Sequence, residues 1–458
     1  MSQKPSIPRG TRDFSPAEML RRNYIFDTVR RNFSLFGYLP LETPAMENLS
    51  TLLGKYGEEG DRLIYRILNS GNFLADINPS DMSSTGSTAV SQLICEKGLR
   101  YDLTVPFARY VVQHRDEITF PFRRYQIQPV WRADKPQKGR YREFFQCDVD
   151  VIGSNSLLNE LELVQIIDRI FTELKVKVTI RVNNRKILAG IAEIAGEKER
   201  ITDITVAVDK LDKIGAEGVR QELLKRGITP EAVAKLEPVI SLSGSTPSKL
   251  LELRKVLAAS EEGLKGIAEM EELFGYLALV QVASAVELDL SLARGLNYYT
   301  GAIIEVRAED VAIGSVCGGG RYDDLTGIFG LPGVSGVGVS FGADRIYDVM
   351  LMLNIFPEQT AAATEALVVN FGSEELPELL KIISSLREAG IPSEIYPDAV
   401  KLKKQFAYAD AQKIPWVIIA GSDEIADQKA TVKDMRTGEQ TTVPLSELPA
   451  YIKSGKIS

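Results

Sequence analysis

The sequence predicts an α+β protein in which a first part with an antiparallel sheet carries a helical insert and is followed by a C-terminal α/β domain. The chain has 458 residues, too many for one hydrophobic core. Two strand-like runs between Arg123 and Ile152 flank a Pro/Gly turn, a pattern typical of an antiparallel hairpin. From about residue 366, short apolar runs alternate with helical stretches, as in a small α/β domain.

The first element is a helix. Ser15-Pro16-Ala17-Glu18 is a capping box with proline at the first helical position. Apolar residues then recur at helical spacing until the chain reaches Gly37: Ile25, Val29, Phe33 and Phe36. Further along, the Ser/Thr/Gly-rich stretch from Pro79 to Gln92 indicates a loop.

The helical insert spans about residues 196–275, where Ala, Leu, Glu and Lys dominate and Thr229-Pro230 and Thr246-Pro247 mark helix starts. A Pro/Gln/Ala/Thr-rich connector around residues 356–364 then precedes the last domain. There, "ALVVNFG", "SEIYP" and "WVIIAG" are the expected strands. We therefore expect a domain at 1–355, interrupted by the insert at 196–275, and a second domain at 366–458.

Composition excludes several classes of site. Ser/His/Asp catalysis and a histidine-ligated zinc need imidazole at a definite place, but the single histidine, His114, lies in a helix-like stretch where a surface or helix-end position is expected. The three cysteines have neither disulfide nor metal-ligand spacing, so we expect a reducing cytoplasm and no protein-only metal site. Neither a secretion signal nor a membrane span is indicated. The net charge of −8 argues against indiscriminate nucleic-acid binding but permits a local basic site.

Such a basic site lies in the hairpin "VWRADKPQKGRYREFFQCDVDVIG" at residues 130–153. Its turn holds one acid, Asp134, among five cations: Arg132, Lys135, Lys138, Arg140 and Arg142. In the second strand, alternate residues share a face. One face is apolar, and the other is sorted from cations to an aromatic ring to carboxylates: Arg140, Arg142, Phe144, Gln146, Asp148 and Asp150.

That order indicates a molecule bound along the strand, with phosphates on the arginines and a flat base on Phe144. A cationic or hydrogen-bonding group would then reach Gln146 and Asp150. An edge hairpin with a charged outer face is the alternative.

Two further motifs bear on the site. In "RGLNYYTG" at residues 294–301, Tyr298 and Tyr299 occupy successive strand positions, so at most one is expected to line the same pocket. The segment "CGGGRYD" lacks the GK[ST] ending of a Walker phosphate loop.

Taken together, these motifs resemble the histidyl-tRNA synthetases, a family of class II aminoacyl-tRNA synthetases. The resemblance covers nearly the whole length and keeps the family's order: "RGTRDF" at 9–14, "LETP" at 41–44, "LRYDLT" at 99–104, the hairpin, "LARGLNYYTG" at 292–301, "GGGRYD" at 318–323 and "GVGVSFGADRI" at 336–346. Asn297 stands where the family form has Asp. The resemblance implies a class II synthetase-like catalytic domain and a C-terminal anticodon-binding domain.

The resemblance also implies roles for individual residues. It places Arg294 and Arg132 at the reacting groups. For ATP it implies Arg132, Asp134, Arg140, Tyr141, Phe144 and Arg345. For L-histidine it implies Asp102, Thr104, Gln146, Asp150, Arg294, Tyr298 and Tyr299, with Asp150 and Tyr299 on the two imidazole nitrogens. Lys135 and Gln137 match positions that face the acceptor end of tRNA.

The implied reaction joins L-histidine to ATP, with Mg²⁺, and then transfers histidine to tRNA(His). Together with the first-helix stripe, the family's first motif indicates a homodimer. Two alternatives remain: a non-catalytic synthetase-like regulatory subunit of ATP phosphoribosyltransferase, which usually loses the catalytic arginines and the last domain, and an adenylate-forming ligase for another small acid.

Overall fold

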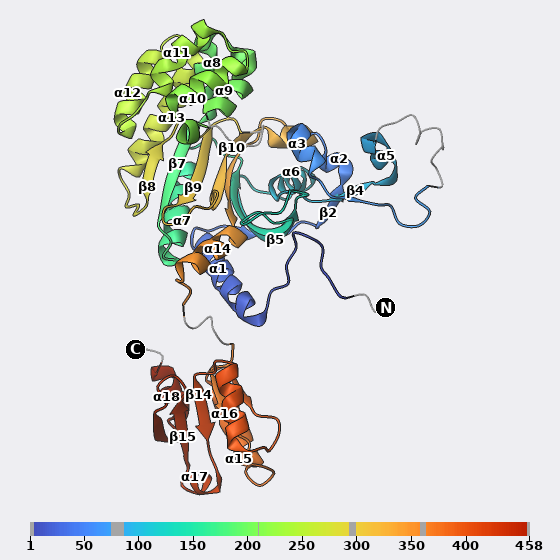
Figure 1. The fold of residues 1–458 in the computed structure, drawn as a ribbon, viewed down its shortest axis with the longest axis vertical. Coiled ribbons are helices and arrows are strands. Elements are labelled where there is room, and N and C mark those ends of the chain that lie inside the picture. The colour runs from blue at the N-terminus through green and yellow to red at the C-terminus, as the bar shows by residue number, and fades with distance from the viewer. Residues whose placement is uncertain (1–3, 75–86, 209, 293–298, 358–362, 456–458) are drawn as a thin grey trace. The chain divides into compact units, whose positions relative to one another are not determined.

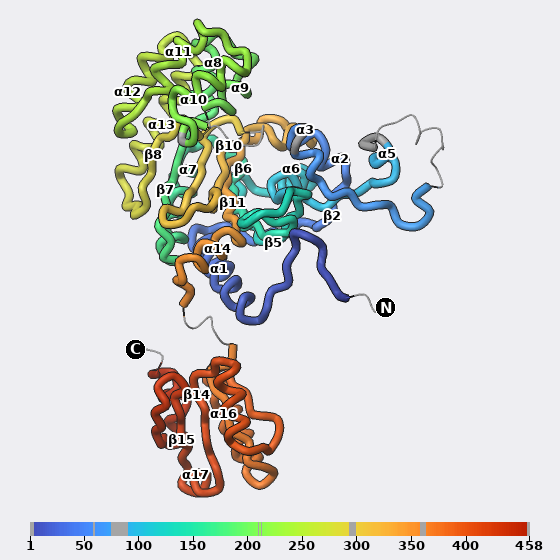
Figure 2. Tube along the Cα trace, in the orientation of Figure 1, coloured from blue at the N-terminus to red at the C-terminus, as the bar shows by residue number. Residues whose placement is uncertain are grey.

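A computed structural model describes residues 4–74, 87–208, 210–292, 299–357 and 363–455 (Figures 1 and 2). Internal contacts divide the chain into two units. The first comprises Met1–Asp13 with Ile25–Ile355, and the second comprises Phe14–Tyr24 with Phe356–Ser458. Each unit has its own sheet and is described by itself.

The first unit is built on an eight-stranded sheet with the order β1-β5-β6-β11-β10-β9-β7-β8. It is antiparallel except where β1 pairs with β5 and β7 pairs with β8. The strands are β1 (Leu39–Pro40), β5 (Phe122–Trp131), β6 (Glu143–Ile152), β7 (Val178–Asn184), β8 (Ala285–Leu288), β9 (Ala302–Ala308), β10 (Cys317–Asp323) and β11 (Ser335–Gly342). Strands β5 and β6 pair from Phe122↔Ile152 to Trp131↔Glu143, which confirms the predicted hairpin.

Helix α1 (Pro16–Leu35) begins at the predicted capping box. The backbone N–H and hydroxyl of Ser15 donate to Glu18 at 2.7 and 2.6 Å. Its apolar stripe is buried in the chain itself, because Ile25 and Phe33 are at most 1% exposed and the Phe33 ring lies 5.7 Å from the Phe341 ring on β11. The stripe is therefore no surface for a second copy, and that basis for the expected homodimer was wrong.

Two glycines let β10 lie close to its neighbours in the middle of the sheet. A Cβ on Gly319 would lie 2.0 Å from the carbonyl oxygen of Gly338, and one on Gly320 would lie 2.4 Å from that of Ala302. Only residues without a side chain fit such an approach. The segment "CGGGRYD" is thus a central strand, and its glycines serve strand packing.

A small sheet with the order β2-β4-β3 and four short helices complete this part of the unit: β2 (Met46–Asn48), β3 (Arg66–Ile67), β4 (Lys97–Leu99), α2 (Leu49–Leu52), α3 (Gly57–Arg62), α5 (Ser87–Ile94) and α6 (Thr104–Gln113). The predicted loop at 79–92 was wrong in its second half, because Ser87–Ile94 is helical. Ile94 packs against the buried cluster around Leu52, a tertiary contact that overrides the Ser/Thr content.

Helices also pack on the large sheet and extend beyond it. Helix α7 (Leu158–Glu173) places the Phe171 ring 5.9 Å from the Phe341 ring, and α14 (Ala343–Leu353) follows β11 directly. One bundle, seen in Figure 1, comprises α8 (Arg185–Ala195), α9 (Ile201–Val208), α10 (Leu211–Lys225), α11 (Pro230–Ile240), α12 (Thr246–Val256) and α13 (Glu261–Leu277). Gly190 and Gly263 let α8 and α13 approach closely, since a Cβ on Gly190 would lie 2.6 Å from the Gly263 Cα.

The second unit has a five-stranded sheet with the order β13-β12-β14-β15-β16. Strands β12 (Ala366–Val368), β13 (Ser393–Ile395) and β14 (Trp416–Ile419) are parallel and correspond to the three predicted runs. The remaining elements are α15 (Leu376–Glu388), α16 (Leu402–Ala411), α17 (Ser422–Ala426), β15 (Lys429–Asp434), β16 (Gln440–Pro444) and α18 (Leu448–Ser454). In the parts of the chain that the structure describes, no helix is both long and apolar enough to cross a membrane.

Candidate active site

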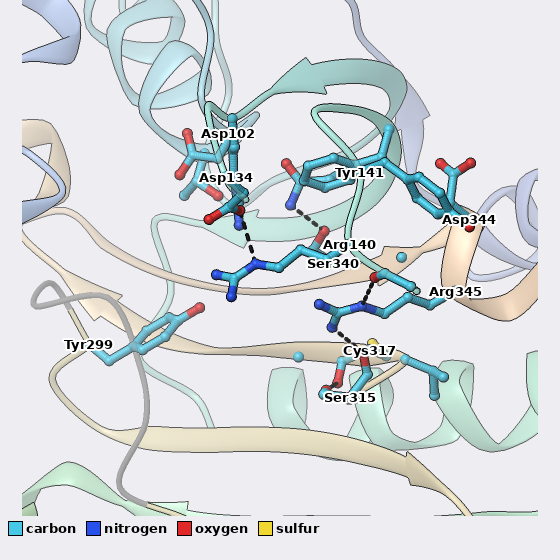
Figure 3. Close-up of a pocket in the computed structure, with 18 residues that line it drawn as sticks. Asp102, Asp134, Arg140, Tyr141, Tyr299, Ser315, Cys317, Ser340, Asp344 and Arg345 are labelled. Carbon is cyan, nitrogen blue, oxygen red and sulfur yellow. Dashed lines mark hydrogen bonds and ion pairs between the residues drawn. The ribbon is translucent and has the colours of Figure 1, made fainter. Parts of the chain in front are cut away.

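A polar cavity of about 280 Å³ in the first unit opens beside the β5–β6 hairpin (Figure 3). Its walls come from the start of α6, the turn before β6, the start of β10, the end of β11 and the start of α14. Six of the lining residues carry charge: Asp102, Arg132, Asp134, Arg140, Asp344 and Arg345.

Three arginines from separate segments face this cavity. Arg140 pairs with Asp134 at 3.1 Å. Arg345 donates from Nε to the Gly139 carbonyl at 2.9 Å and from Nη1 to the Ser315 carbonyl at 2.7 Å. Burial, with the positive charges of Arg132 and Arg140 nearby, lowers the pKa of Arg345. Among the described residues, Arg140 is the only one of the three that pairs with a carboxylate, so the cavity suits a polyanion.

Arg132 is held at the inner end of the turn. Its Nε donates to the Tyr101 carbonyl at 3.0 Å, and its guanidinium lies 4.2 Å from the Tyr101 ring centroid and 5.2 Å from that of Phe144. Stacking of this kind fixes a planar cation without using all of its donors. The arginine is therefore oriented before any anion binds.

The structure brings most of the predicted face of β6 to the cavity. Phe144 and Gln146 line it, and Asp148 and Asp150 line a small adjoining cavity of about 20 Å³. Arg142 departs from the predicted alternation, because it precedes the strand and its Nε donates to the Asp134 carbonyl at 3.1 Å. Alternation holds only where the backbone is extended.

Asp102 lies just before α6, at the deep end of the larger cavity. Its Oδ1 accepts from the Val105 backbone N–H at 3.2 Å and from the Tyr56 hydroxyl at 2.9 Å. Its Oδ2 is buried and has no hydrogen-bond partner among the described residues. Burial raises the pKa of this carboxyl group. A ligand ammonium would supply the missing donors, and the Thr104 hydroxyl lies beside it in the same wall.

The smaller cavity is continuous with the larger one through Thr104, Tyr299, Gly318 and Ser340, which line both. At its end the buried Asp150 pairs with the fully buried Arg124 of β5 at 2.9 Å. Asp150 also accepts a hydrogen bond of 2.5 Å from the Tyr322 hydroxyl. Burial raises the pKa of Asp150, although Arg124 opposes that rise.

Four residues of this site were missed by reasoning from the hairpin alone: Tyr56, Arg124, Tyr322 and Ser340. Ser340 accepts a hydrogen bond from the Gln146 amide at 2.9 Å and lies directly opposite Asp148 across β11 and β6. Tyr322 could have been found, because it belongs to the "GGGRYD" motif. No local signal marks Tyr56 or Arg124, which reach the site only through the tertiary fold.

Models of protein families match both units. One described as "Histidyl-tRNA synthetase" matches residues 96–346, and one described as "Anticodon binding domain" matches residues 365–455. The chain belongs to the histidyl-tRNA synthetase family. The expected fold class, a class II synthetase-like α+β domain with a helical insert and a C-terminal anticodon-binding α/β domain, is thereby confirmed.

Members of the family align over the full chain. A protein of Phocaeicola vulgatus named Histidine–tRNA ligase is 61% identical over 454 residues, which cover 99% of this chain and 100% of the relative. A protein of the same name from Bacteroides fragilis is 58% identical over 98% of this chain and 99% of its own. The crystal structure of histidyl-tRNA synthetase from Nostoc sp. PCC 7120 has a TM-score of 0.83 at 34% identity, covering 99% of this chain and 100% of that one.

Not all residues expected from the family resemblance belong to the part of the chain that the structure describes. Arg294, Tyr298 and Asn297 are outside the described residues. Tyr299 is described and lines both cavities. Lys135 and Gln137 are exposed on the turn between β5 and β6, where a macromolecule could reach them.

The family implies Mg²⁺ together with ATP. Among the residues described, no group of three or more His, Cys, Asp or Glu side chains could hold a metal ion. Asp134 and Asp344 line the cavity, but they pair with Arg140 and Arg12. Mg²⁺ commonly binds through substrate phosphates and water with only one or two carboxylates. The residues fit that arrangement, with the phosphates of a nucleotide as the main ligands.

Proposed function

We infer that this protein activates L-histidine with ATP, forming histidyl-adenylate and pyrophosphate, and then transfers histidine to the 3′ end of tRNA(His). One observation carries the inference. Arg132, Arg140 and Arg345 face a cavity whose deep end holds Asp102, a buried carboxylate with one oxygen unpartnered among the described residues. A triphosphate and an amino acid would therefore meet inside one site, as adenylation requires.

The chemistry of the first step suits this set of groups. The histidine carboxylate is already an anion, so it attacks the α-phosphorus of ATP without a protein base, and pyrophosphate leaves. Charge that develops on the phosphoryl oxygens is stabilised by preorganised arginines, which bind oxyanions bidentately. We assign Arg132 to the α-phosphate and Arg140 and Arg345 to the outer phosphates. Mg²⁺, arriving with ATP, would neutralise further phosphate charge.

The adenine ring would stack on Phe144, on the cavity side of β6. Asp134 and Tyr141 line the same cavity and are proposed as adenine-side contacts. Both are held in place, since Asp134 pairs with Arg140 and the Tyr141 hydroxyl donates to Asp348 at 2.9 Å.

Histidine would span the two cavities. Asp102, Thr104 and Gln146 would hold its ammonium group and orient the carboxylate. Asp150 and Tyr299 would contact the two imidazole nitrogens, one accepting and one donating. A buried pair of this kind rejects side chains that lack both groups by about 10⁴ to 10⁵ without an editing step.

For Arg294 and Tyr298, we propose roles on the basis of the family resemblance. Arg294 would act at the reacting phosphorus and carboxylate, and Tyr298 would lie beside the histidine. Both belong to the segment that follows β8 and leads into Tyr299, which lines both cavities. That sequence neighbourhood supports the assignment.

For the second step, we propose that tRNA contacts the exposed Lys135 and Gln137 with its acceptor end and the 366–458 domain with its anticodon. In this division the catalytic domain spans 1–355 and the helical insert spans 196–275. The match of residues 365–455 to an anticodon-binding family supports the second part.

We also propose a homodimer, now on a different surface. Four large apolar side chains in or near β1, β2 and the start of β5 are exposed: Leu35, Leu39, Met46 and Phe120. Exposed apolar patches mark interfaces, and we propose that these side chains contribute to one. A cytoplasmic location is proposed because Cys95, Cys147 and Cys317 are all free thiols.

The test of function is charging of purified tRNA(His) with labelled histidine. We expect ATP-dependent transfer that stops when histidine is omitted. If the protein were instead a regulatory subunit of ATP phosphoribosyltransferase, no charging would occur. This alternative has less support, because the full-length relatives are named Histidine–tRNA ligase.

A further inference from the structure

The N-terminal segment Arg9–Arg12 runs along the back of the turn that carries Arg140. The Gly10 carbonyl accepts a hydrogen bond from the Arg142 backbone N–H at 2.8 Å, and the Arg9 carbonyl accepts one from Arg142 Nη1 at 3.2 Å. Gly10 has a φ of +90°, and a Cβ there would lie 2.9 Å from the side chains of Arg142 and Pro136. The segment therefore fits against the turn only with glycine at this position.

Arg12 extends this contact to helix α14. Its guanidinium pairs with Asp344 on the first turn of that helix and lies 3.3 Å from the centroid of the Tyr141 ring. The second oxygen of Asp344 accepts from the Phe145 backbone N–H at 2.8 Å. Figure 3 shows Tyr141 and Asp344 adjacent at the same end of the cavity. One cation thus connects the turn, the start of β6 and α14.

The turn needs such a connection because of its own charges. Arg140 lies on it, Arg132 lies at its base and Arg345 faces both across the cavity. Arg132 and Arg140 both lower the pKa of Arg345, so the three cations repel one another until an anion arrives. Asp134 offsets only part of this repulsion, through Arg140.

We propose that Arg12 is a positioning residue for ATP: it holds the turn at residues 139–142 against α14, so that the phosphate-binding arginines are in place before the nucleotide binds. Arg12 contacts Asp344 and Tyr141 and acts through them. The proposal rests on the inferred adenylation activity and adds to it a role for the N-terminal segment.

The experiment measures histidine-dependent ATP–pyrophosphate exchange with the full-length protein. Arg12→Gln is expected to raise the KM for ATP about tenfold, because a displaced contact costs binding of that order, while kcat and the KM for histidine stay within about twofold. Arg12→Lys keeps the ion pair but not the planar stacking. Its KM for ATP should therefore lie between that of the unmodified protein and that of Arg12→Gln. Arg30→Gln, which removes an exposed ion pair with Asp27 on α1, is the matched control and should leave both KM values unchanged.

Gly10→Ala is a second variant that displaces the segment without removing charge, and it should also raise the KM for ATP selectively. The proposal is overturned if the KM for ATP is unchanged in Arg12→Gln and Gly10→Ala. It is equally overturned if the KM values for ATP and histidine rise together with a lower Tm, or if none of these variants folds, since the segment would then be purely structural. Absence of exchange in the unmodified protein would instead contradict the adenylation activity itself.

Discussion

At the scale of single residues, the histidine end of the site holds two carboxylates and one cation. Asp148 and Asp150 lie two residues apart on the same face of β6, both fully buried, and Arg124 is their shared counter-ion. Burial raises the pKa of Asp148 to about 7, with Asp150 and Asp102 adding to the rise and Arg124 and Ser340 opposing it. Near neutral pH, Asp148 therefore exchanges a proton.

This arrangement predicts how stability depends on pH. The unfolded carboxyl group titrates near 3.8 and the folded one near 7, so between these values the native state holds a proton that the unfolded chain has released. The contribution of Asp148 to stability is thus present at low pH and is lost as pH rises toward 7. Asp148→Asn has no proton to release at this position, so the variant should not lose this stability as pH rises. The Tm of the variant minus that of the unmodified protein should therefore increase from pH 5 to pH 8. A difference that is constant or decreases would refute the assignment.

A second prediction concerns the carboxylate proposed for the substrate ammonium. Tyr56→Phe removes the hydroxyl that donates to Asp102 at 2.9 Å and leaves the ring stack with Tyr101 at 4.6 Å. One hydrogen bond to a charged group contributes about 1.5 kcal/mol, so the KM for histidine should rise roughly tenfold and that for ATP should not change. Exchange kinetics check this, with Tyr276→Phe, whose hydroxyl bonds an exposed Glu272, as control. An equal effect on both substrates would count against the role of Tyr56.

At the scale of elements, the site depends on how closely β11 lies beside β6. Gly338 pairs with Asp150 in register, and a Cβ at this glycine would lie 2.0 Å from the Asp150 Oδ1. The glycine therefore makes room for the carboxylate. Strand β11 therefore borders the proposed histidine pocket with a residue that has no side chain.

Gly338→Ala should consequently displace Asp150 and weaken histidine binding much more than ATP binding. Overpacking of a core typically costs about 1–3 kcal/mol, so a lower Tm is expected as well. Isothermal titration with histidine and with ATP measures the two effects separately. Gly275→Ala, at a helical position with open space around it, is the control. Unchanged histidine affinity in Gly338→Ala would show that the pocket does not depend on this contact.

Elements with local signals were predictable from the sequence. The capping box sets the start of α1, the turn between β5 and β6 sets the hairpin, and alternation along β6 places Gln146 and Asp150 on one face. Alternation failed at Arg142, which lies in the turn. The loop expected at 79–92 was wrong at α5, where a contact with the Leu52 cluster decides the structure.

Residues that reach the site from other strands and loops could not be predicted in this way. Arg124 faces Asp150 because β5 pairs with β6 in one register, and Tyr322 reaches it from β10, a strand that does not adjoin β6. Sequence periodicity gives the face of a residue within its own strand. It does not give the order of strands in a sheet, which is set by tertiary packing.

At the scale of the whole molecule, the proposed function assigns separate parts of the reaction to the two units. The first holds the cavity with its arginines and carboxylates, and residues 365–455 of the second match an anticodon-binding family. Each has its own buried core. Adenylation and tRNA recognition should therefore be separable.

Deleting residues 366–458 tests that separation. Histidine-dependent pyrophosphate exchange should persist within a fewfold of the full-length rate, because no residue of the cavity is removed. Charging of tRNA(His) should fall by at least about a hundredfold, as the loss of a second binding module removes its gain in effective concentration. Charging at the full rate would contradict an anticodon contact by this domain.

The most direct test of the central claim is ATP–pyrophosphate exchange by the purified full-length protein, measured with each of the twenty amino acids in turn. Because the cavity with the arginines proposed to bind phosphate adjoins the one with the buried Asp150, and Tyr299 lines both, we predict exchange with histidine and with no other amino acid. Exchange with a different amino acid, or with none, would contradict the account.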